Sequence, residues 1–476
     1  MLVVASASGV IARAAVHTVP AAGGRLTIHL AAPSRFLNPL LASTDVDVAA
    51  TSLAFPGLTR LGPTGSYQPS LSSGWSVSNH GRTFTFSLRS GLRWQDGRSV
   101  TSSDVAYTYR ILASPGFPNQ RPELVGMRIH TPNARTVVFT LPRPDYTFVQ
   151  NSTVGIVPSG FAHSMWPIGS GAFRVHAVTP GTITLAATGQ SGSAGQPRLS
   201  QVVLPVGPGT AGSSALACAS SFFSPASAVV VPTTRLAGLI LNVRGMRYAA
   251  MRMALIATVA RFLGPVTPTP TWPSTRLNVH FGRPADILRR AGWHRIHGYW
   301  TRRHHSPTVT LAASTNPLFN RLVHAVVAAW RRTGFHVKLI RRPFPTLVRS
   351  ILYPGAFGAA IVDWDFGGPE YDPGRIWSRS SALNFARLDD PRLNRLSRAI
   401  QSNPSPRGRN RLRAQYGVDL VRDGAALGLR PEQYRCSLPP MLHGFRRPSL
   451  VADAAGLVQG APDWYVNTRL SLRNPF

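Results

Sequence analysis

Carboxylates are scarce in this sequence of 476 residues, which has 18 Asp and Glu against 51 Lys and Arg and a formal net charge of +33. Lysine is nearly absent as well, because Lys338 is the sole lysine and almost all of the positive charge is arginine. A balance of this kind is typical of nucleic-acid-binding proteins. However, the arginines occur as singles and pairs along the whole chain, without a run of five basic residues. Coding bias and an exterior poor in carboxylates are therefore favoured, and nucleic-acid binding stays as the alternative from another class.

Cysteine and long apolar segments are also scarce. Two cysteines, Cys218 and Cys436, exclude a Cys-rich metal site and a multi-disulfide scaffold. They either pair in an oxidising compartment or remain buried thiols. The apolar run 2–12 has the length of a signal-peptide core but is too short to span a bilayer, and it lacks a charged leading region. We expect residues 1–22 to be a degenerate or truncated export signal, or a tail.

Motifs of catalysis are poorly represented. The segment 189–193 lacks the final glycine of a nucleophile elbow, and 169–171 has neither the third glycine of a dinucleotide loop nor a Walker lysine. His304 and His305 are adjacent, point apart and have no carboxylate nearby to complete a metal site. The sequence therefore predicts no enzymatic activity, no metal and no cofactor.

The clearest local pattern covers residues 83–113. Residues 83–88 alternate polar and apolar side chains, as expected for a half-buried strand. Asp96-Gly97 is typical of a tight turn. Thr101 or Ser102 can then cap a helix over about 103–113.

Further elements follow at helical and strand spacing. Residues 247–263 and 318–333 predict amphipathic helices, and 335–340 predicts a strand. The segment 178–216 is dominated by Gly, Ser, Ala, Thr and Pro, which favours loops there. Because helices and strands alternate along the chain, we expect an α/β architecture.

Residues 92–108 also resemble the signature of a known family, the extracytoplasmic solute-binding proteins for oligopeptides, dipeptides and nickel (family 5). Other segments resemble the motifs of this family in the same order, and together they extend the resemblance over about residues 25 to 450. These segments are 36–39, 58–61, 68–78, 136–142, 169–173, 239–242, 251–255, 291–298 and 364–373.

The resemblance implies a type II periplasmic-binding-protein fold, in which two α/β lobes are joined by a hinge and accompanied by an extra subdomain. Carried over to this chain, lobe one takes 23–55, 155–235 and 440–476. The extra subdomain takes 56–154, and lobe two takes 236–439. Ligand is expected between the lobes, which close around it by hinge motion.

The candidate ligand site lies mainly in residues 363–372, which hold four of the 18 acidic residues. In the peptide-binding members of the family, this segment supplies a carboxylate for the α-amino group of the ligand and an aromatic ring that packs on it. Glu370 fits that anchor role by alignment, and Asp365 is its rival because the spacing after Trp364 is longer than usual. Asp372 is expected to cap the following turn instead. The expected ligand-binding residues are Glu370, Asp365, Trp364, Tyr371, Ser43 and Asp45.

The function implied by the resemblance is that of a monomeric extracytoplasmic protein, in the periplasm or at the cell surface. It would bind a short peptide or similar solute and deliver it to the membrane permease of an ABC importer. Nickel chelates, opines and sugars remain alternative solutes for the same fold.

Overall fold

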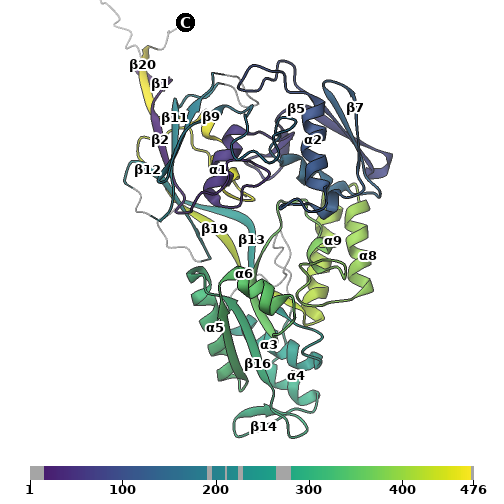
Figure 1. Ribbon diagram of the computed structural model, residues 1–476. Helices are drawn as coiled ribbons and strands as arrows, with labels where there is room; N and C mark the ends of the chain where they lie inside the picture. The colour runs from purple at the N-terminus through teal and green to yellow at the C-terminus, as the bar shows by residue number, and fades with distance from the viewer. Residues whose placement is uncertain (1–15, 190–195, 209–211, 223–228, 264–279, 473–476) are drawn as a thin grey trace, which may run out of the picture.

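The computed structural model describes residues 16–472 except 190–195, 209–211, 223–228 and 264–279. The apolar run 2–12 and the Pro-rich stretch 265–273 therefore lie outside the described residues. Two long strands organise the rest of the chain, β13 (Val229–Leu241) and β19 (Ala426–Ser437). They pair with each other in an antiparallel arrangement and run between two α/β lobes (Figure 1). The predicted fold class, two lobes with an extra subdomain, is confirmed.

One ten-stranded sheet passes through both lobes in the order β17-β16-β18-β13-β19-β12-β2-β11-β10-β9. On the lobe-one side, Leu26, Ile28, Val202 and Leu204 alternate inward and pack against helix α1 in one hydrophobic core. The elements of this lobe are β2 (Arg25–His29), α1 (Asp45–Ala54), β9 (Phe173–Thr179), β10 (Thr182–Ala187), β11 (Gln201–Pro205), β12 (Ala215–Ser221) and α10 (Ala454–Val458).

Three strands, β10, β11 and the start of β12, lie in the segment 178–216, for which the composition favoured loops. That expectation is wrong for these stretches. Ile183 and Leu185 are fully buried, and so are Val202 and Leu204. Two buried side chains at alternate positions are enough to fix each strand on the core, even though the rest of the segment is small and polar.

The extra subdomain is built on a four-stranded sheet of order β5-β6-β8-β7, with helix α2 packed against it. The predicted strand 83–88 and the predicted helix are confirmed as β6 and α2. The Asp104 carboxylate accepts hydrogen bonds from the backbone N–H and the hydroxyl of Thr101, which precedes α2. The elements are β3 (Thr59–Leu61), β4 (Tyr67–Pro69), β5 (Ser72–Ser78), β6 (Thr83–Leu88), α2 (Ser102–Ala113), β7 (Arg128–Asn133) and β8 (Thr136–Thr140).

The crossover from this subdomain to lobe one passes close to the end of α1. Backbone N–H groups of Ser170 and Gly171 donate to the Ala54 carbonyl at 3.0 and 2.8 Å. A Cβ atom at Gly169 would lie 2.2 Å from the same oxygen, so only glycine permits this approach. The segment 169–171 is thus a close-packed backbone junction.

Lobe two carries the remaining helices on both faces of its part of the sheet (Figure 1). The predicted helices at 247–263 and 318–333 are confirmed as α3 and α5, and the predicted strand as β17. The elements are α3 (Ala249–Phe262), α4 (Pro284–Arg290), β14 (His294–Ile296), β15 (Tyr299–Thr301), β16 (Thr308–Ser314), α5 (Asn320–Arg332), β17 (His336–Arg342), α6 (Phe344–Leu347), β18 (Ala359–Asp365), α7 (Gly374–Trp377), α8 (Pro391–Ser402) and α9 (Pro406–Arg422).

Separate hydrophobic cores fill the three parts of the molecule, two of them in lobe two. The exact domain boundaries given above remain a prediction. Strand β1 (Val16–Ala21) pairs with β20 (Asn467–Leu472) near the chain ends. A leader that ended at residue 22 would include this strand.

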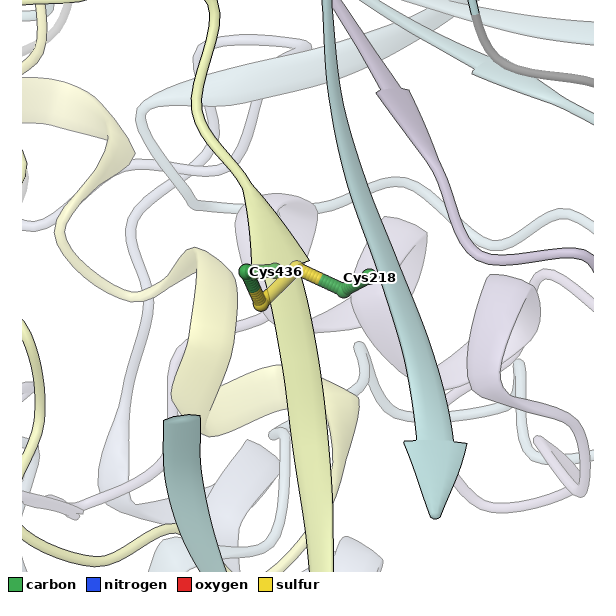
Figure 2. Close-up of a disulfide and its surroundings, with 2 residues drawn as sticks. All are labelled: Cys218 and Cys436. Atoms are coloured by element: carbon green, nitrogen blue, oxygen red, sulfur yellow. A yellow bond between two sulfur atoms is a disulfide. The ribbon is translucent and has the colours of Figure 1, made fainter. Parts of the chain in front are cut away.

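Cys218 and Cys436 form a disulfide (Figure 2). The two residues face each other directly across β12 and β19, and both side chains are buried. Of the two alternatives left open by the sequence, the structure has the paired one. The bond ties a strand of lobe one to one of the two strands that cross between the lobes.

Candidate functional site

Charged side chains from both lobes gather where β13 and β19 cross between the lobes. Asp45 is the first residue of α1 in lobe one, and Asp365 is the last residue of β18 in lobe two. Antiparallel pairing of β13 with β18 places Arg235 directly opposite Asp365. The site therefore draws on both lobes and on the strands between them.

Arg235 is the cation at the centre of this group. Its Nε atom lies 3.5 Å from Asp365 Oδ2, and its Nη1 atom lies 3.8 Å from Glu432 Oε1. Asp365 Oδ1 also accepts hydrogen bonds from the Thr234 hydroxyl at 3.1 Å and from the Gly367 N–H at 2.8 Å. The Asp365 side chain nevertheless keeps 47% of its surface exposed, whereas that of Glu432 keeps 3%.

Five carboxylates surround this arginine, and we call Asp45, Asp363, Asp365, Glu432 and Asp453 the acidic cluster. Burial raises the pKa of Asp45 and of Glu432, and the positive charge of Arg235 opposes that rise. Burial, together with the charge of Asp365, raises the pKa of Asp453 to about 6. Arg235 is the cation that acts on each of these three groups. The cluster thus holds more carboxylate than one guanidinium can balance.

Such a surplus suits a positively charged ligand group. A cation placed beside the carboxylates would replace lost hydration and add charge-assisted hydrogen bonds. A cavity of about 270 Å³ is lined by Asp453 of the cluster, by residues of α1, and by Arg60 and Arg121. Among the described residues, no group of three or more His, Cys, Asp or Glu side chains is arranged to hold a metal ion.

Glu370, the first anchor candidate, lies in a different environment. Its Oε2 atom accepts hydrogen bonds from Arg409 Nε at 2.7 Å and from Arg413 Nη2 at 2.9 Å. Burial alone would raise the pKa of Glu370, but the hydrogen bond from Arg409 and the charge of Arg413 hold it below its usual value. Both arginines are themselves buried, so this carboxylate already neutralises charge inside lobe two.

The aromatic candidates are in the lobe-two core. Trp364 is 6% exposed and packs edge-on against Trp377, with ring centroids 4.9 Å apart. Tyr371 is 2% exposed, packs on Phe366 and lies beneath the Arg413 guanidinium. Their predicted contact with a ligand remains a prediction.

Two other predicted residues complete the account. Ser43 is exposed, two residues before α1, and so lies on the Asp45 side of the site. Asp372 is buried and accepts hydrogen bonds from Gly374 N, Ser397 Oγ and Gln401 Nε2. Asp372 therefore caps the turn before α7, as expected from the sequence.

Three residues of this site were not predicted, namely Arg235 and two members of the acidic cluster, Glu432 and Asp453. Arg235 lies about 200 positions before the other two in the sequence, and the pairing of β13 with β19 brings it beside Glu432. The sequence did contain one sign of Arg235's importance, because this charged residue interrupts the largely apolar segment 229–241. A charge inside such a strand needs a partner or a function.

The two-lobed α/β architecture places this chain in a fold class, that of the type II periplasmic binding proteins. The solved structures agree. The oligopeptide-binding protein AppA from Bacillus subtilis, in complex with a nonapeptide, shares the fold with a TM-score of 0.73 and 17% identity, over 94% of this chain and 100% of that one. NikZ from Campylobacter jejuni, in complex with Ni(L-His), has a TM-score of 0.72 and 16% identity, over 93% of this chain and 99% of that one.

Sequence comparison adds a match of part of the chain to one family. Residues 66–218 match the sequence model of the bacterial extracellular solute-binding proteins, family 5 (middle region). The oligopeptide-binding protein OppA of Bacillus subtilis is 30% identical over 95 residues, which is 20% of this chain and 17% of that relative's length. Over residues 66–218 the chain is therefore similar to solute-binding protein family 5, and the solved structures share its fold.

Proposed function

We propose that this protein is an extracytoplasmic solute-binding protein that captures a short peptide, or a similar solute with an ammonium group, between its two lobes. The acidic cluster carries the proposal, since it faces both lobes and has a surplus of carboxylate. The solute is then handed to the membrane permease of an ABC importer. The protein acts as a monomer, without a cofactor and without catalysis.

The ammonium anchor is assigned to Asp365, with Asp45 facing it from lobe one. Asp365 has one long contact to Arg235 and nearly half of its side-chain surface free, whereas Glu370 is held by two buried arginines. A ligand cation between Asp45 and Asp365 would bridge the lobes. Such bridging is what favours a closed state over an open one.

The proposed location outside the cytoplasm rests on the similarity to extracellular solute-binding proteins and on the disulfide. Paired cysteines persist in oxidising compartments and are rare in the cytosol. Among the described residues, no helix is both long and apolar enough to cross a bilayer. An export signal in the first 22 residues stays part of the proposal, and detection of intact protein with Met1 mainly in the cytosol would contradict it.

The decisive experiment measures binding of short peptides by calorimetry, after mass spectrometry has identified the solute released from protein purified from its native host. Asp365→Asn is expected to weaken binding at least about tenfold, or roughly 1.4 kcal/mol. Acetylation of the peptide amino group should weaken wild-type binding similarly and add little in the variant, because both changes remove one interaction.

Asp389→Asn is the matched control, since Asp389 is an exposed carboxylate paired with one arginine outside the cluster. It should bind like the wild type. If Asp365→Asn also binds normally, the anchor assignment fails. A nickel chelate, opine or sugar released from the native protein would replace the peptide on the same fold. Tight DNA binding that weakens steeply with salt would instead favour the nucleic-acid alternative.

A further inference from the structure

The outer end of lobe two carries an excess of positive charge that solute binding does not explain. We call residues 280–308 and 329–338 the tip; they include α4, the β14–β15 hairpin and the end of α5 (Figure 1). The tip holds nine Arg or Lys residues and a single carboxylate, Asp286. Asp286 is already paired with Arg289 at 3.2 Å. The tip is therefore strongly cationic.

Several contacts hold the parts of the tip together. Arg295 Nη2 and Trp300 Nε1, both on the hairpin, donate to the Thr333 carbonyl after α5, each at 2.7 Å. The backbone N–H of Trp300 also donates to the Gly334 carbonyl. These bonds bring the hairpin against the C-terminal end of α5, so Arg331 and Arg332 lie close to the hairpin arginines. The cationic residues of the hairpin and of α5 thus come together at the outer end of the lobe.

The backbone of the tip is also unusual. Arg303 and His304 have φ values of 51° and 62° and form a two-residue turn, closed by reciprocal hydrogen bonds between Arg302 and His305. Turns of this geometry normally use Asn-Gly, because side chains with a Cβ are strained there. Here the turn places two basic side chains at its outermost point, and strain of this kind is typical of functional positions.

Apolar side chains accompany the charge. Ile296 and Tyr299, which flank the hairpin turn, keep 38% and 39% of their surface exposed. The Tyr299 ring stacks on His336, with ring centroids 3.6 Å apart. Arginine together with exposed aliphatic and aromatic groups on a protruding hairpin matches the headgroup region of a bilayer, where the charge meets lipid phosphates and the apolar groups enter the boundary layer.

We propose that the tip of lobe two binds the surface of a bilayer rich in anionic lipid. The choice of a bilayer rests on the proposed place of the protein beside a membrane permease, but the binding itself needs no solute. If the tip does not bind lipid, solute binding between the lobes is unchanged. If the protein does not bind solute, lipid binding by the tip is unchanged. The two proposals can therefore fail independently.

The test is co-sedimentation of the full chain with vesicles of phosphatidylcholine containing about one-third phosphatidylglycerol, against pure phosphatidylcholine. The wild type is expected to bind only the anionic vesicles and to be released by salt. Neutralisation of three exposed tip residues, Arg290→Gln, Arg303→Gln and Arg332→Gln, should weaken this binding at least about tenfold, since each basic group near the surface contributes to attraction.

The matched control removes the same charge from exposed positions on α8 and α9, with Arg395→Gln, Arg398→Gln and Arg411→Gln. It should stay within about threefold of the wild type, because these groups lie away from the tip. Equal loss in both triple variants would show that net charge alone attracts the lipid and would overturn the proposal. Absence of binding to anionic vesicles would do the same.

Ile296→Ser distinguishes a bilayer from a soluble phosphate polymer. It should weaken vesicle binding and leave binding of inorganic polyphosphate unchanged, since only a bilayer offers an apolar layer to enter. If vesicles and polyphosphate respond alike to this variant, the tip is a phosphate-polymer site and the bilayer assignment is wrong.

Discussion

At the scale of single residues, Glu370 shows that an alignment can identify a segment near the site without identifying what each residue in that segment does. The four carboxylates of 363–372 were predicted together from their density in a carboxylate-poor chain. The structure assigns them different environments, because Glu370 is turned toward Arg409 and Arg413 while Asp365 ends a strand at the cleft. Residues 409 and 413 are distant in sequence, so nothing local revealed the partners.

Glu370→Gln is therefore expected to lower the free energy of unfolding by about 3–5 kcal/mol, because it leaves two buried guanidinium groups without their charge partner. The pKa of Glu370 is lowered in the folded state, so its stabilisation is present above the usual pKa of a glutamate and disappears as the pH falls through the lowered value. Urea unfolding at neutral and acidic pH measures both effects. Asp286→Asn, which breaks an exposed pair, should cost no more than about 1 kcal/mol. A stable Glu370→Gln protein that fails to bind solute would instead make Glu370 the anchor.

The raised pKa of Asp453 leads us to expect that solute binding depends on pH. Its pKa is raised to about 6 by burial and by Asp365, so it gains a proton as the pH falls through that value. A cationic solute prefers the charged carboxylate, and its affinity should therefore be full above about pH 6 and decrease below it. Asp453→Asn should flatten this dependence. Calorimetry on both sides of that pH tests it, and an unchanged profile in the variant would exclude Asp453 as the titrating group.

At the scale of elements, the sequence predicted those pieces whose pattern is local. Helices α2, α3 and α5 and strands β6 and β17 were recognised, because apolar periodicity and capping residues act within about a dozen positions. Strands β10 and β11 were missed, since small polar residues surround two buried positions each. The arrangement of β13 beside β19 was beyond local reasoning, because it joins residues about 200 positions apart. Glu432 of the acidic cluster was missed for the same reason, since it lies on β19 beside Arg235 of β13.

The disulfide between β12 and β19 carries a prediction at this scale. It closes a loop between cysteines that are 218 residues apart, and cross-links over long loops stabilise mainly by restricting the unfolded chain. Replacing both cysteines with alanine should lower the free energy of unfolding by about 2–5 kcal/mol. Chemical denaturation with and without reductant tests this. Reductant should destabilise the wild type and leave the variant unchanged, and a wild type insensitive to complete reduction would contradict it.

At the scale of the whole molecule, one ion-pair group connects lobe two to the extra subdomain. Arg375, at the start of α7, lies 3.3 Å from Glu123 Oε1 and 3.6 Å from Asp145 Oδ2. Each of these side chains is mostly buried. Because Arg375 belongs to lobe two and both carboxylates belong to the extra subdomain, a rotation that moves these two parts of the molecule apart breaks this contact. It therefore biases the balance between closed and open forms.

Solute binding should shift that balance further, since a ligand held between Asp45 and Asp365 stabilises the closed form by its differential affinity. Small-angle scattering should give a smaller radius of gyration with solute than without. Arg375→Gln should raise the radius of gyration without solute and weaken solute binding, although Arg375 contacts no member of the acidic cluster in the structure. Arg379→Gln is the control, because its exposed pair with Asp389 does not join lobe two to the subdomain.

A radius of gyration that stays constant at saturating solute would exclude lobe closure. The radius of gyration could instead decrease with solute in the wild type and be the same in solute-free Arg375→Gln as in the solute-free wild type. In that case β13 and β19 alone set the balance between open and closed forms.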